Sequence, residues 1–425
     1  MRLLAWEIVF IAGIAGGAAT CAGLVAPRRY LPWLAFAGSI AGAALGAGVV
    51  GVWNTAITPE TAVIAAFVGL GAAIGGYALG AAVLPVVTRL HPRPVAIDGA
   101  PDDGTVHLVL LADVEPEDYR PGDLTRTLDL YESVDVPLPP YLTRPLVYAS
   151  EQARYRRVGR SPARDAVRKV ASALGARPDG ETPRGVSVAF CSGGATLAET
   201  VASLVGLGGR RIIVVALTVA WTREFDHAVA DACDLDLRGR GVELVVTEPL
   251  WASQGLAAAA ARRALTAFGE NGLEDGVVLV SEGNPWQWDR EYPVAAEQST
   301  FFAQRVRSEL VEAGLPTDRI RQAWLEWEQP DIPEAVRHLA ALGAAQIALV
   351  PVDFLVTTLS AAVDLPLAGE RATFETGIRI EVVPPLEDEP ALISALRGEI
   401  ARAATTLEVL DDTCGGPSSP GTARG

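Results

Sequence analysis

The chain has 425 residues, half of them hydrophobic, and a formal net charge of −16 at neutral pH. A chain of this length has room for two or three domains, and an acidic body argues against a nucleic-acid partner. The four cysteines are far apart in the sequence. This fits a reducing compartment and excludes a zinc site or an iron–sulfur cluster held by closely spaced cysteines.

Three long apolar segments lie at the start of the chain, at residues 3–26, 31–53 and 62–87. Each is long enough to cross ~30 Å of hydrocarbon as a helix, and Glu7 is the only charged residue in them. A cleavable signal peptide would explain the first segment but neither of the others. The sequence therefore predicts three transmembrane helices that form a membrane anchor over residues 1–94.

Basic residues set the expected orientation of this anchor. Arg28 and Arg29 lie in the first loop and Arg89 and Arg93 follow the third segment, whereas the second loop, residues 54–60, has no basic residue. By the positive-inside rule, the N-terminus lies outside and everything after the third segment lies in the cytoplasm. We expect a multi-pass protein of the cell membrane. Glycines along the segments allow close helix contact in lipid, so pairing between chains into a homo-oligomer is one expectation.

The remaining chain alternates apolar strands with helical stretches, after a linker rich in Pro, Gly and Asp at residues 92–104. Strands are expected at residues 107–112, 186–190, 212–217, 242–246, 277–280, around 323, 346–352 and 379–383. Strands separated by helices imply parallel sheets with right-handed crossovers. We therefore expect an α/β fold of two doubly wound, Rossmann-like lobes, over residues 105–270 and 271–410, with a cleft between them. A disordered tail is expected at residues 411–425.

The helices expected between these strands complete the pattern. They cover residues 148–174 with a break at 161–162, 196–207, 225–233, 253–267, 297–313, 332–342, 357–363 and 391–407. Residues 137–145 contain too many prolines for a helix. A tryptophan-rich loop is expected after strand 277–280.

Motifs for nucleotide binding and for serine hydrolases are missing. Gly193-Gly194 follows a strand, but neither a third glycine nor the acidic partner of a ribose accompanies it. No Gly-x-Ser-x-Gly sequence occurs. Among the four histidines only His227, at the start of a helix near the edge of the cleft, is a candidate for chemistry. For each histidine a hydrogen-bonded or solvent-facing imidazole is the simpler interpretation.

Two carboxylates follow expected strands of the second lobe. Glu282 comes directly after strand 277–280 and precedes Gly283, so its side chain should project from the carboxyl edge of the sheet, where ligands bind in open α/β folds. It could hold a cation or accept protons from a ring nitrogen, or it could serve only in a turn. Asp353 has the comparable place after strand 346–352 and could instead cap the following helix. With His227 they make up the expected metal-ligand set.

Aromatic residues gather at the same expected edge. Candidates for holding a flat apolar ligand are Trp221, Trp286, Trp288, Tyr292 and Trp324, and Trp327 lies in a loop of the same kind. Aromatic rings there could sandwich such a ligand. The alternative is that they pack between the two lobes.

Over residues 106–410 the sequence resembles the ferrochelatase family, whose members insert iron into a porphyrin. In the first lobe, the family's Tyr-x-x-x-Gly-Gly-Ser-Pro segment aligns with residues 155–162. In the second lobe, its Ser-x-His-Gly-x-Pro motif aligns with residues 280–285, its Asp-Pro-Tyr-Pro element with 290–293 and its Trp-Leu-x-Pro stretch with 324–330. Its Val-Pro-x-x-Phe-x-x-x-x-Leu-Glu-Thr-Leu signature aligns with residues 350–362. The blocks occur in the family's order. The resemblance implies two chelatase-like lobes with a tetrapyrrole as partner.

Two positions depart from the family pattern. Glu282 stands where the family has a histidine, and Ser360 where it has a glutamate. The resemblance places catalysis at these two positions, because an imidazole and a carboxylate together can ligate iron(II) and remove pyrrole protons. It therefore implies either a membrane-anchored enzyme that inserts divalent iron, as substrate, into a porphyrin for haem biosynthesis, or an inactive homologue that binds a tetrapyrrole or a protein partner. No resident cofactor is expected.

Overall fold

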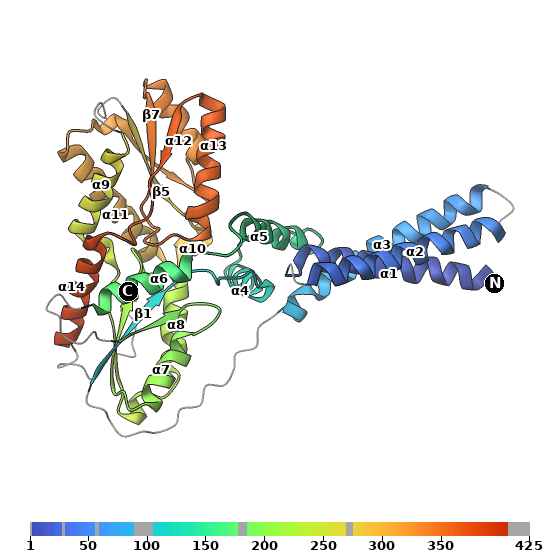
Figure 1. Cartoon of the computed structure of the whole chain (residues 1–425), viewed down its shortest axis with the longest axis horizontal. Coiled ribbons are helices and arrows are strands. Elements are labelled where there is room, and N and C mark those ends of the chain that lie inside the picture. The colour runs from blue at the N-terminus through green and yellow to red at the C-terminus, as the bar shows by residue number, and fades with distance from the viewer. Residues whose placement is uncertain are drawn as a thin grey trace, which may run out of the picture. The chain divides into compact units, whose positions relative to one another are not determined.

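The computed structural model describes residues 2–27, 30–55, 59–88, 105–176, 185–268 and 275–406. The chain divides into two compact units (Figure 1). The helical unit consists of residues 1–92 and 118–159, and the α/β unit of residues 93–117 and 160–425. Residues 118–159, which were expected in the first lobe at 105–270, therefore belong to the helical unit. The expected tail at 411–425 lies outside the described residues.

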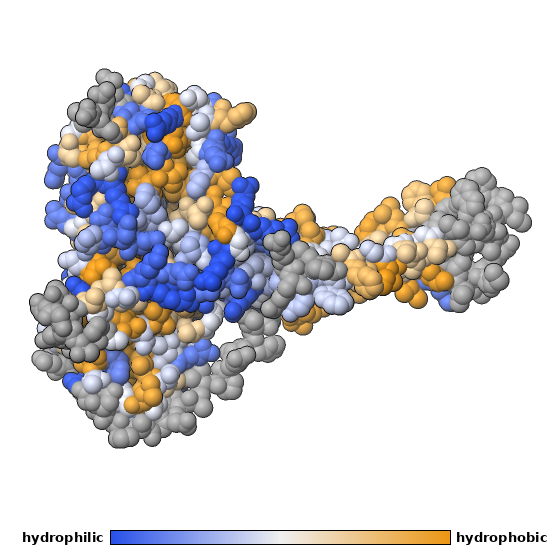
Figure 2. Space-filling view, viewed as in Figure 1, coloured by the Kyte–Doolittle hydropathy of each residue, from blue (hydrophilic) through white to orange (hydrophobic). Residues whose placement is uncertain are grey.

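The helical unit begins with three long helices, α1 (Arg2–Val25), α2 (Leu31–Thr55) and α3 (Pro59–Thr88). Glycine allows α1 and α3 to approach closely, since a Cβ at Gly17 would lie 1.8 Å from the carbonyl oxygen of Ala73. Such contacts between small residues are typical of helices packed in lipid. Apolar side chains cover much of the outer surface of these helices (Figure 2).

Two described segments, Glu7–Val25 and Val63–Thr88, are long and apolar enough to cross a membrane by length and composition. In α2 the apolar stretch within the described part of the chain, Trp33–Gly48, is shorter. The structure thus has all three expected helices, but three membrane spans are not confirmed.

Two further helices, α4 (Pro121–Glu132) and α5 (Arg144–Val158), complete the helical unit. Leu128 of α4 and Tyr148 of α5 form a small buried cluster with Val25 of α1 and Leu84 of α3. The hydroxyl groups of Tyr148 and Thr125 are hydrogen-bonded at 2.8 Å. These two helices therefore share their core with the ends of α1 and α3.

The α/β unit contains two four-stranded sheets with the same order of strands. The first has the order β2-β1-β3-β4 and the second β6-β5-β7-β8, and every pairing is parallel. Their bounds are β1 (Val106–Ala112), β2 (Val186–Phe190), β3 (Arg211–Ala216), β4 (Glu243–Val246), β5 (Gly276–Ser281), β6 (Ile320–Trp324), β7 (Gln346–Pro351) and β8 (Arg379–Val382). The expected strands and the two parallel sheets are confirmed. The central strands read as continuous apolar runs because both of their faces are buried.

Helices connect the strands of both sheets. They are α6 (Ala163–Gly175), α7 (Leu197–Gly206), α8 (Arg223–Cys233), α9 (Gln254–Thr266), α10 (Trp286–Glu291), α11 (Pro293–Glu312), α12 (Ile332–Ala341), α13 (Leu365–Thr376) and α14 (Pro390–Thr406). Polar residues begin several of them: Thr196 and Glu199 form a capping box on α7. Two expectations differ from the structure. The tryptophan-rich loop contains α10, and the helix expected at 357–363 is a π-helical turn, Ser360–Asp364, that leads into α13.

One hydrophobic core spans both lobes. It contains Leu110 and Val215 of the first sheet and Leu279 and Val350 of the second. Between the sheets, α9 packs against α11. Helix α14, which ends the second lobe in sequence, packs against β3, β4, α6 and α9 of the first lobe. The two lobes therefore form one body with a common interior.

Candidate active site

The loop after β5 carries Glu282 at the carboxyl edge of the second sheet. Gly283 has φ +88°, and a Cβ there would lie 2.1 Å from the carbonyl oxygen of Glu326. Only glycine fits such a position without strain. The N–H of Glu326 donates to the Glu282 carbonyl at 3.0 Å, and the N–H of Asn284 donates to Glu328 Oε1 at 3.2 Å. The loop is thus fixed to the segment that follows β6, and the Glu282 side chain is exposed.

Ser360 meets Glu282 at this edge. Its Oγ donates to Glu282 Oε1 at 3.0 Å. Ser360 begins the π-helical turn after β7, and π-helical turns occur frequently at functional sites. Because β5 and β7 are neighbours in the sheet, the loops that follow them end side by side. The structure therefore brings together the two positions at which the sequence departs from the ferrochelatase pattern, while their catalytic roles stay a prediction.

Asp353 is hydrogen-bonded to the backbone of Glu282 and to Ser299. Its Oδ1 accepts a hydrogen bond from Ser299 Oγ at 2.7 Å, and its Oδ2 accepts one from the backbone N–H of Glu282 at 3.4 Å. Burial raises the pKa of the Asp353 carboxyl, against hydrogen bonds that favour its charged form. The π-helical turn has no side-chain cap, so Asp353 orients the Glu282 backbone instead of capping a helix.

Two further carboxyls near the Glu282 loop also have raised pKa values. Burial raises the pKa of Asp289, against a hydrogen bond from the Asn284 side chain. Burial likewise raises the pKa of Glu328, and the neighbouring charges of Asp289 and Asp353 add to that effect. Partly buried carboxylates that repel one another resist full ionisation.

Glu115, after β1 of the first lobe, is a residue that sequence reasoning missed. Its Oε1 accepts a hydrogen bond from the backbone N–H of Leu359 at 2.7 Å, and also one from the hydroxyl of the buried Ser161. A carboxylate of the first lobe thus fixes the residue before Ser360. The sequence could have indicated Glu115 by its position shortly after a central strand, because Glu282 follows β5 in the same way.

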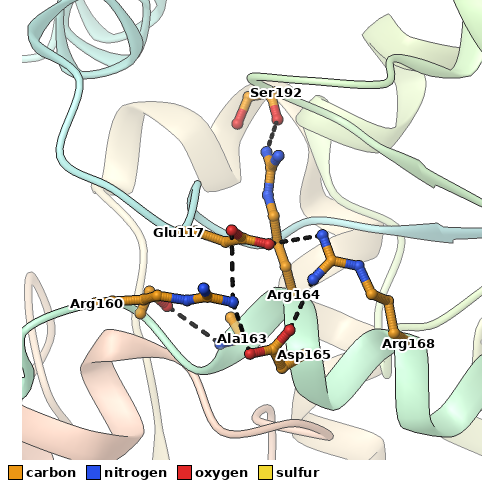
Figure 3. A network of polar contacts seen from close by, with 8 residues as sticks. Glu117, Arg160, Ala163, Arg164, Asp165, Arg168 and Ser192 are labelled. Atoms are coloured by element: carbon orange, nitrogen blue, oxygen red, sulfur yellow. Dashed lines mark hydrogen bonds and ion pairs between the residues drawn. The ribbon is translucent and has the colours of Figure 1, made fainter.

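A network of ion pairs fixes the loop that carries Glu115 (Figure 3). Glu117, two residues further on, accepts from Arg168 Nη2 at 2.6 Å and pairs with Arg160 at 3.5 Å. Asp165 in turn pairs with Arg160 at 2.8 Å and with Arg168 at 2.7 Å. Most of these groups are about half exposed, so each pair contributes little to stability. Together they fix the loop to the start of α6.

Two of the predicted aromatic contacts with a ligand are used for packing instead. Trp221 is buried in the first-lobe core, 6.0 Å from the Phe225 ring, and its backbone N–H donates to Gln298 Oε1 at 2.7 Å. Trp288 is buried as well. The alternative expected these rings between the lobes: Trp288 lies beside Arg223 of the first lobe, whereas Trp221 packs within the first lobe.

Arg223 of α8 joins the lobes through a group that we call the Arg223 clasp: Arg223, Trp288, Glu291 and Tyr292. Its guanidinium lies 5.7 Å from the Trp288 ring centre and 5.6 Å from that of Tyr292, and it pairs with Glu291 at 3.4 Å. The Tyr292 hydroxyl also donates to Asp226 Oδ2 at 3.1 Å. Tyr292 is therefore held by the first lobe.

The remaining aromatic candidates lie near the Glu282 loop. Trp286 is 64% exposed, and Trp327 is also exposed and has φ 64°, which is unusual for a bulky residue. Trp324 at the end of β6 is half-buried. Trp286, whose ring lies 5.2 Å from the Arg290 guanidinium, and Trp327 are the more exposed tryptophans of this region.

The predicted metal-ligand set is only partly assembled. Glu282 and Asp353 are neighbours, but His227 accepts a hydrogen bond from Arg223 Nε at 3.4 Å. Within the residues that the structure describes, no three His, Cys, Asp or Glu side chains are grouped closely enough to hold a metal ion. His227 points to the clasp because it lies one helical turn after Arg223 on α8.

Comparison with known proteins finds similarity to chelatases. The CbiX family matches residues 293–403, about a quarter of the chain. No curated protein sequence matches significantly. The structure is similar to SirB from Bacillus subtilis, solved with Fe3+, at 15% identity and a TM-score of 0.45, covering 57% of this chain and 90% of SirB.

Two structures of CbiX proteins are also similar. One, described as a putative cobalamin biosynthesis protein from Marinobacter aquaeolei, is 22% identical with a TM-score of 0.25 and covers 31% of this chain and 98% of its own. The other, described as the terminal enzyme of sirohaem biosynthesis in denitrifying bacteria, is 14% identical with a TM-score of 0.38 and covers 70% and 98%. Over residues 293–403, which include Ser360, this chain is therefore similar to CbiX, a chelatase-like domain.

Proposed function

We propose that this protein binds a tetrapyrrole and inserts a divalent metal ion into it. The observation that carries this proposal is the hydrogen bond between Ser360 and Glu282, at 3.0 Å, on the carboxyl edge of the second sheet. Support comes from the CbiX match that begins at residue 293 and includes Ser360. Ligands bind at this edge in open α/β sheets.

In metal insertion the two pyrrole N–H groups lose their protons while the metal ion forms bonds to the four ring nitrogens. Glu282 accepts these protons one at a time and passes each to water, because its side chain is exposed. The Ser360 hydroxyl donates to Oε1 and so fixes the orientation of the carboxylate. An ionised carboxylate is also a ligand that a divalent metal ion accepts on its way to the ring. Trp286 and Trp327 offer faces for the flat macrocycle.

Two forms of this reaction are proposed. Iron insertion into a porphyrin, as in haem biosynthesis, is what the ferrochelatase resemblance implies. The similar SirB is described as a sirohydrochlorin chelatase with cobalt, so sirohydrochlorin and cobalt belong among the probes.

The test is anaerobic incubation of the full chain in lipid nanodiscs with Fe2+ or Co2+ and sirohydrochlorin, coproporphyrin or protoporphyrin. We expect the absorption spectrum of one macrocycle to change to that of its metal complex. Glu282→Gln should lower the rate by about 100-fold. Glu375→Gln is the matched control, because Glu375 makes only surface ion pairs, with Arg337 and Arg371. The proposal fails if no macrocycle gains metal faster than without protein.

The second candidate is an inactive homologue that binds a tetrapyrrole or a protein partner. It is favoured by Ser360, which carries no charge where the family has a carboxylate. In this case the macrocycle spectrum shifts on binding, but it does not become that of the metal complex in the presence of either metal.

We further propose that α1–α3 anchor the body in the cell membrane, with the body in the cytoplasm. Length and composition of α1 and α3 support this, as do large exposed apolar residues along them, such as Phe10 and Phe67. The chain should resist extraction from membranes by alkaline carbonate. A reporter fused after Gly425 should be active only if that end is cytoplasmic, and activity on the opposite side would reverse the orientation.

A further inference from the structure

The start of α5 exposes large apolar side chains that nothing else in the helical unit covers in full. Tyr141, Leu142 and Leu146 are 50%, 54% and 55% exposed, and we call these three residues the apolar rim. They surround Arg144, which is buried and begins α5. Exposed groups of large apolar side chains often mark a surface that contacts a protein or a membrane.

The apolar rim lies beside the last turns of the apolar helices. Gln152 Nε2 donates to the carbonyl oxygen of Ala26, one residue beyond α1. One turn earlier on α5, Tyr148 packs with Val25 and Leu84, which lie inside the ends of α1 and α3. Helix α5 packs against the C-terminal end of α1 (Figure 1). With a rise of 1.5 Å per residue, Leu146 is about 9 Å before Gln152 along α5. The rim thus lies on the Tyr148 side of Gln152, towards the residues of α5 that pack with the ends of α1 and α3.

Aromatic residues mark the same end of the helical unit. Tyr30 begins the turn into α2, where its N–H donates to the Pro27 carbonyl at 2.9 Å, and the Tyr30 and Trp33 side chains are exposed. Tyr141 of the rim is exposed as well, and Tyr and Trp are enriched where a membrane meets water.

The charge within the apolar rim is compensated. The Arg144 guanidinium lies 4.0 Å from the centre of the Tyr141 ring and pairs with Glu132 at 3.3 Å. Its Nε donates to the carbonyl of Pro139. The Arg144 charge is therefore paired, which lowers the cost of moving it into a less polar layer.

We propose that the apolar rim is a membrane-contact surface, which enters the layer between lipid head groups and acyl chains beside α1 and α3. This rests on the proposed membrane anchor and adds a contact that the anchor alone does not require. Helices α4 and α5 are then a collar at the membrane surface, of the kind that interfacial amphipathic segments form.

The test is depth-dependent quenching of single labels in the full chain, reconstituted in phosphatidylcholine vesicles. Leu142→Cys and Leu146→Cys carry an environment-sensitive nitrobenzoxadiazole label, in a chain whose native cysteines are replaced by serine. Phe67→Cys on α3 reports on the anchor. Phe374→Cys is the matched control, since Phe374 is an apolar residue of the α/β unit that is 91% exposed.

Lipids brominated near the head group should quench labels at 142 and 146 several-fold more than the label at 374, and lipids brominated along the acyl chains should quench the label at 67. If the label at 67 is quenched but those at 142 and 146 behave like the label at 374, the membrane-contact proposal is overturned and the anchor stands. If the label at 67 is not quenched either, the anchor itself fails, and the contact proposal fails with it.

Discussion

The two sheets of the α/β unit have the same topology, yet the carboxylates in the loops after β1 and β5 have different environments. After β1, Glu115 accepts from the backbone N–H of Leu359 and from the hydroxyl of Ser161. After β5, Glu282 is exposed and makes a side-chain hydrogen bond with Ser360. The comparison teaches that one fold element, used twice, provides a carboxylate that holds a backbone N–H of the other lobe and a carboxylate that is exposed.

The largest expected effect comes from the turn that directs Glu282. Gly283→Ala puts a Cβ 2.1 Å from the Glu326 carbonyl at φ +88°. We expect a loss of about 3 kcal/mol in the free energy of unfolding and loss of metal insertion. Gly377→Ala is the control, because Gly377 has φ +72° but no atom within 4 Å of a Cβ. Urea unfolding of both variants measures the difference, and equal losses would show that the contact with Glu326 does not matter.

Removing the other carboxylate tests its positioning role. Glu115→Ala leaves the buried Leu359 N–H without this acceptor, at a cost of about 1–3 kcal/mol. The rate of metal insertion should fall because Ser360 is no longer held in place, and Glu115→Gln, which keeps an acceptor oxygen, should restore most of it. Glu117→Ala breaks half-exposed ion pairs of the same loop and should change stability by about 1 kcal/mol or less. Equal activity of Glu115→Ala and the wild type would leave Glu115 without a role at the site.

The carboxyls near the Glu282 loop give a pH dependence. Burial raises the pKa of Asp289, Glu328 and Asp353, so the folded chain keeps their protons to higher pH than the unfolded chain does. The free energy of unfolding should therefore fall as pH rises from about 4 through these raised values. Asp289→Asn should make that fall smaller in urea titrations over the range. A steeper fall in the variant would contradict the sign.

The smallest effect is expected at the Arg223 clasp. Arg223→Ala removes the cation over Trp288 and Tyr292, which should cost about 1 kcal/mol. Arg290→Ala is the control, since Arg290 lies 5.2 Å from the ring of the exposed Trp286 and should matter less. Thermal unfolding compares the two, and an equal effect would mean that the clasp adds nothing to the contact between lobes.

Much of the fold could be predicted because buried parallel strands are apolar runs bounded by glycine, proline or charge. The bounds of β2, Val186–Phe190, were predicted to the residue. Helices α4 and α10 escaped prediction because α4 is polar and begins at Pro121, and α10 has six residues. The grouping of residues 118–159 with α1–α3 depends on packing of Tyr148 and Leu128, which chain order does not reveal.

The site could be predicted only where local sequence places a side chain. Glu282 follows a strand and precedes a glycine, and this pattern is visible in the sequence. The hydrogen bond from Leu359 to Glu115 joins residues 244 positions apart, so no local pattern indicates it. The tryptophans show the same limit, since Trp286 and Trp288 are two residues apart, yet one ring is exposed and the other is buried near Arg223 of the first lobe.

Helix α14 has a consequence for how the protein is made. Leu392 and Leu396 of α14 complete the core beneath β3 and β4, although the ribosome adds them after the rest of the second lobe. The first lobe must therefore wait, with apolar surface uncovered, while the second lobe is synthesised, and domains in this state are prone to aggregate. If α1–α3 anchor the chain in the membrane as proposed, this tether would keep such intermediates apart from one another during that interval.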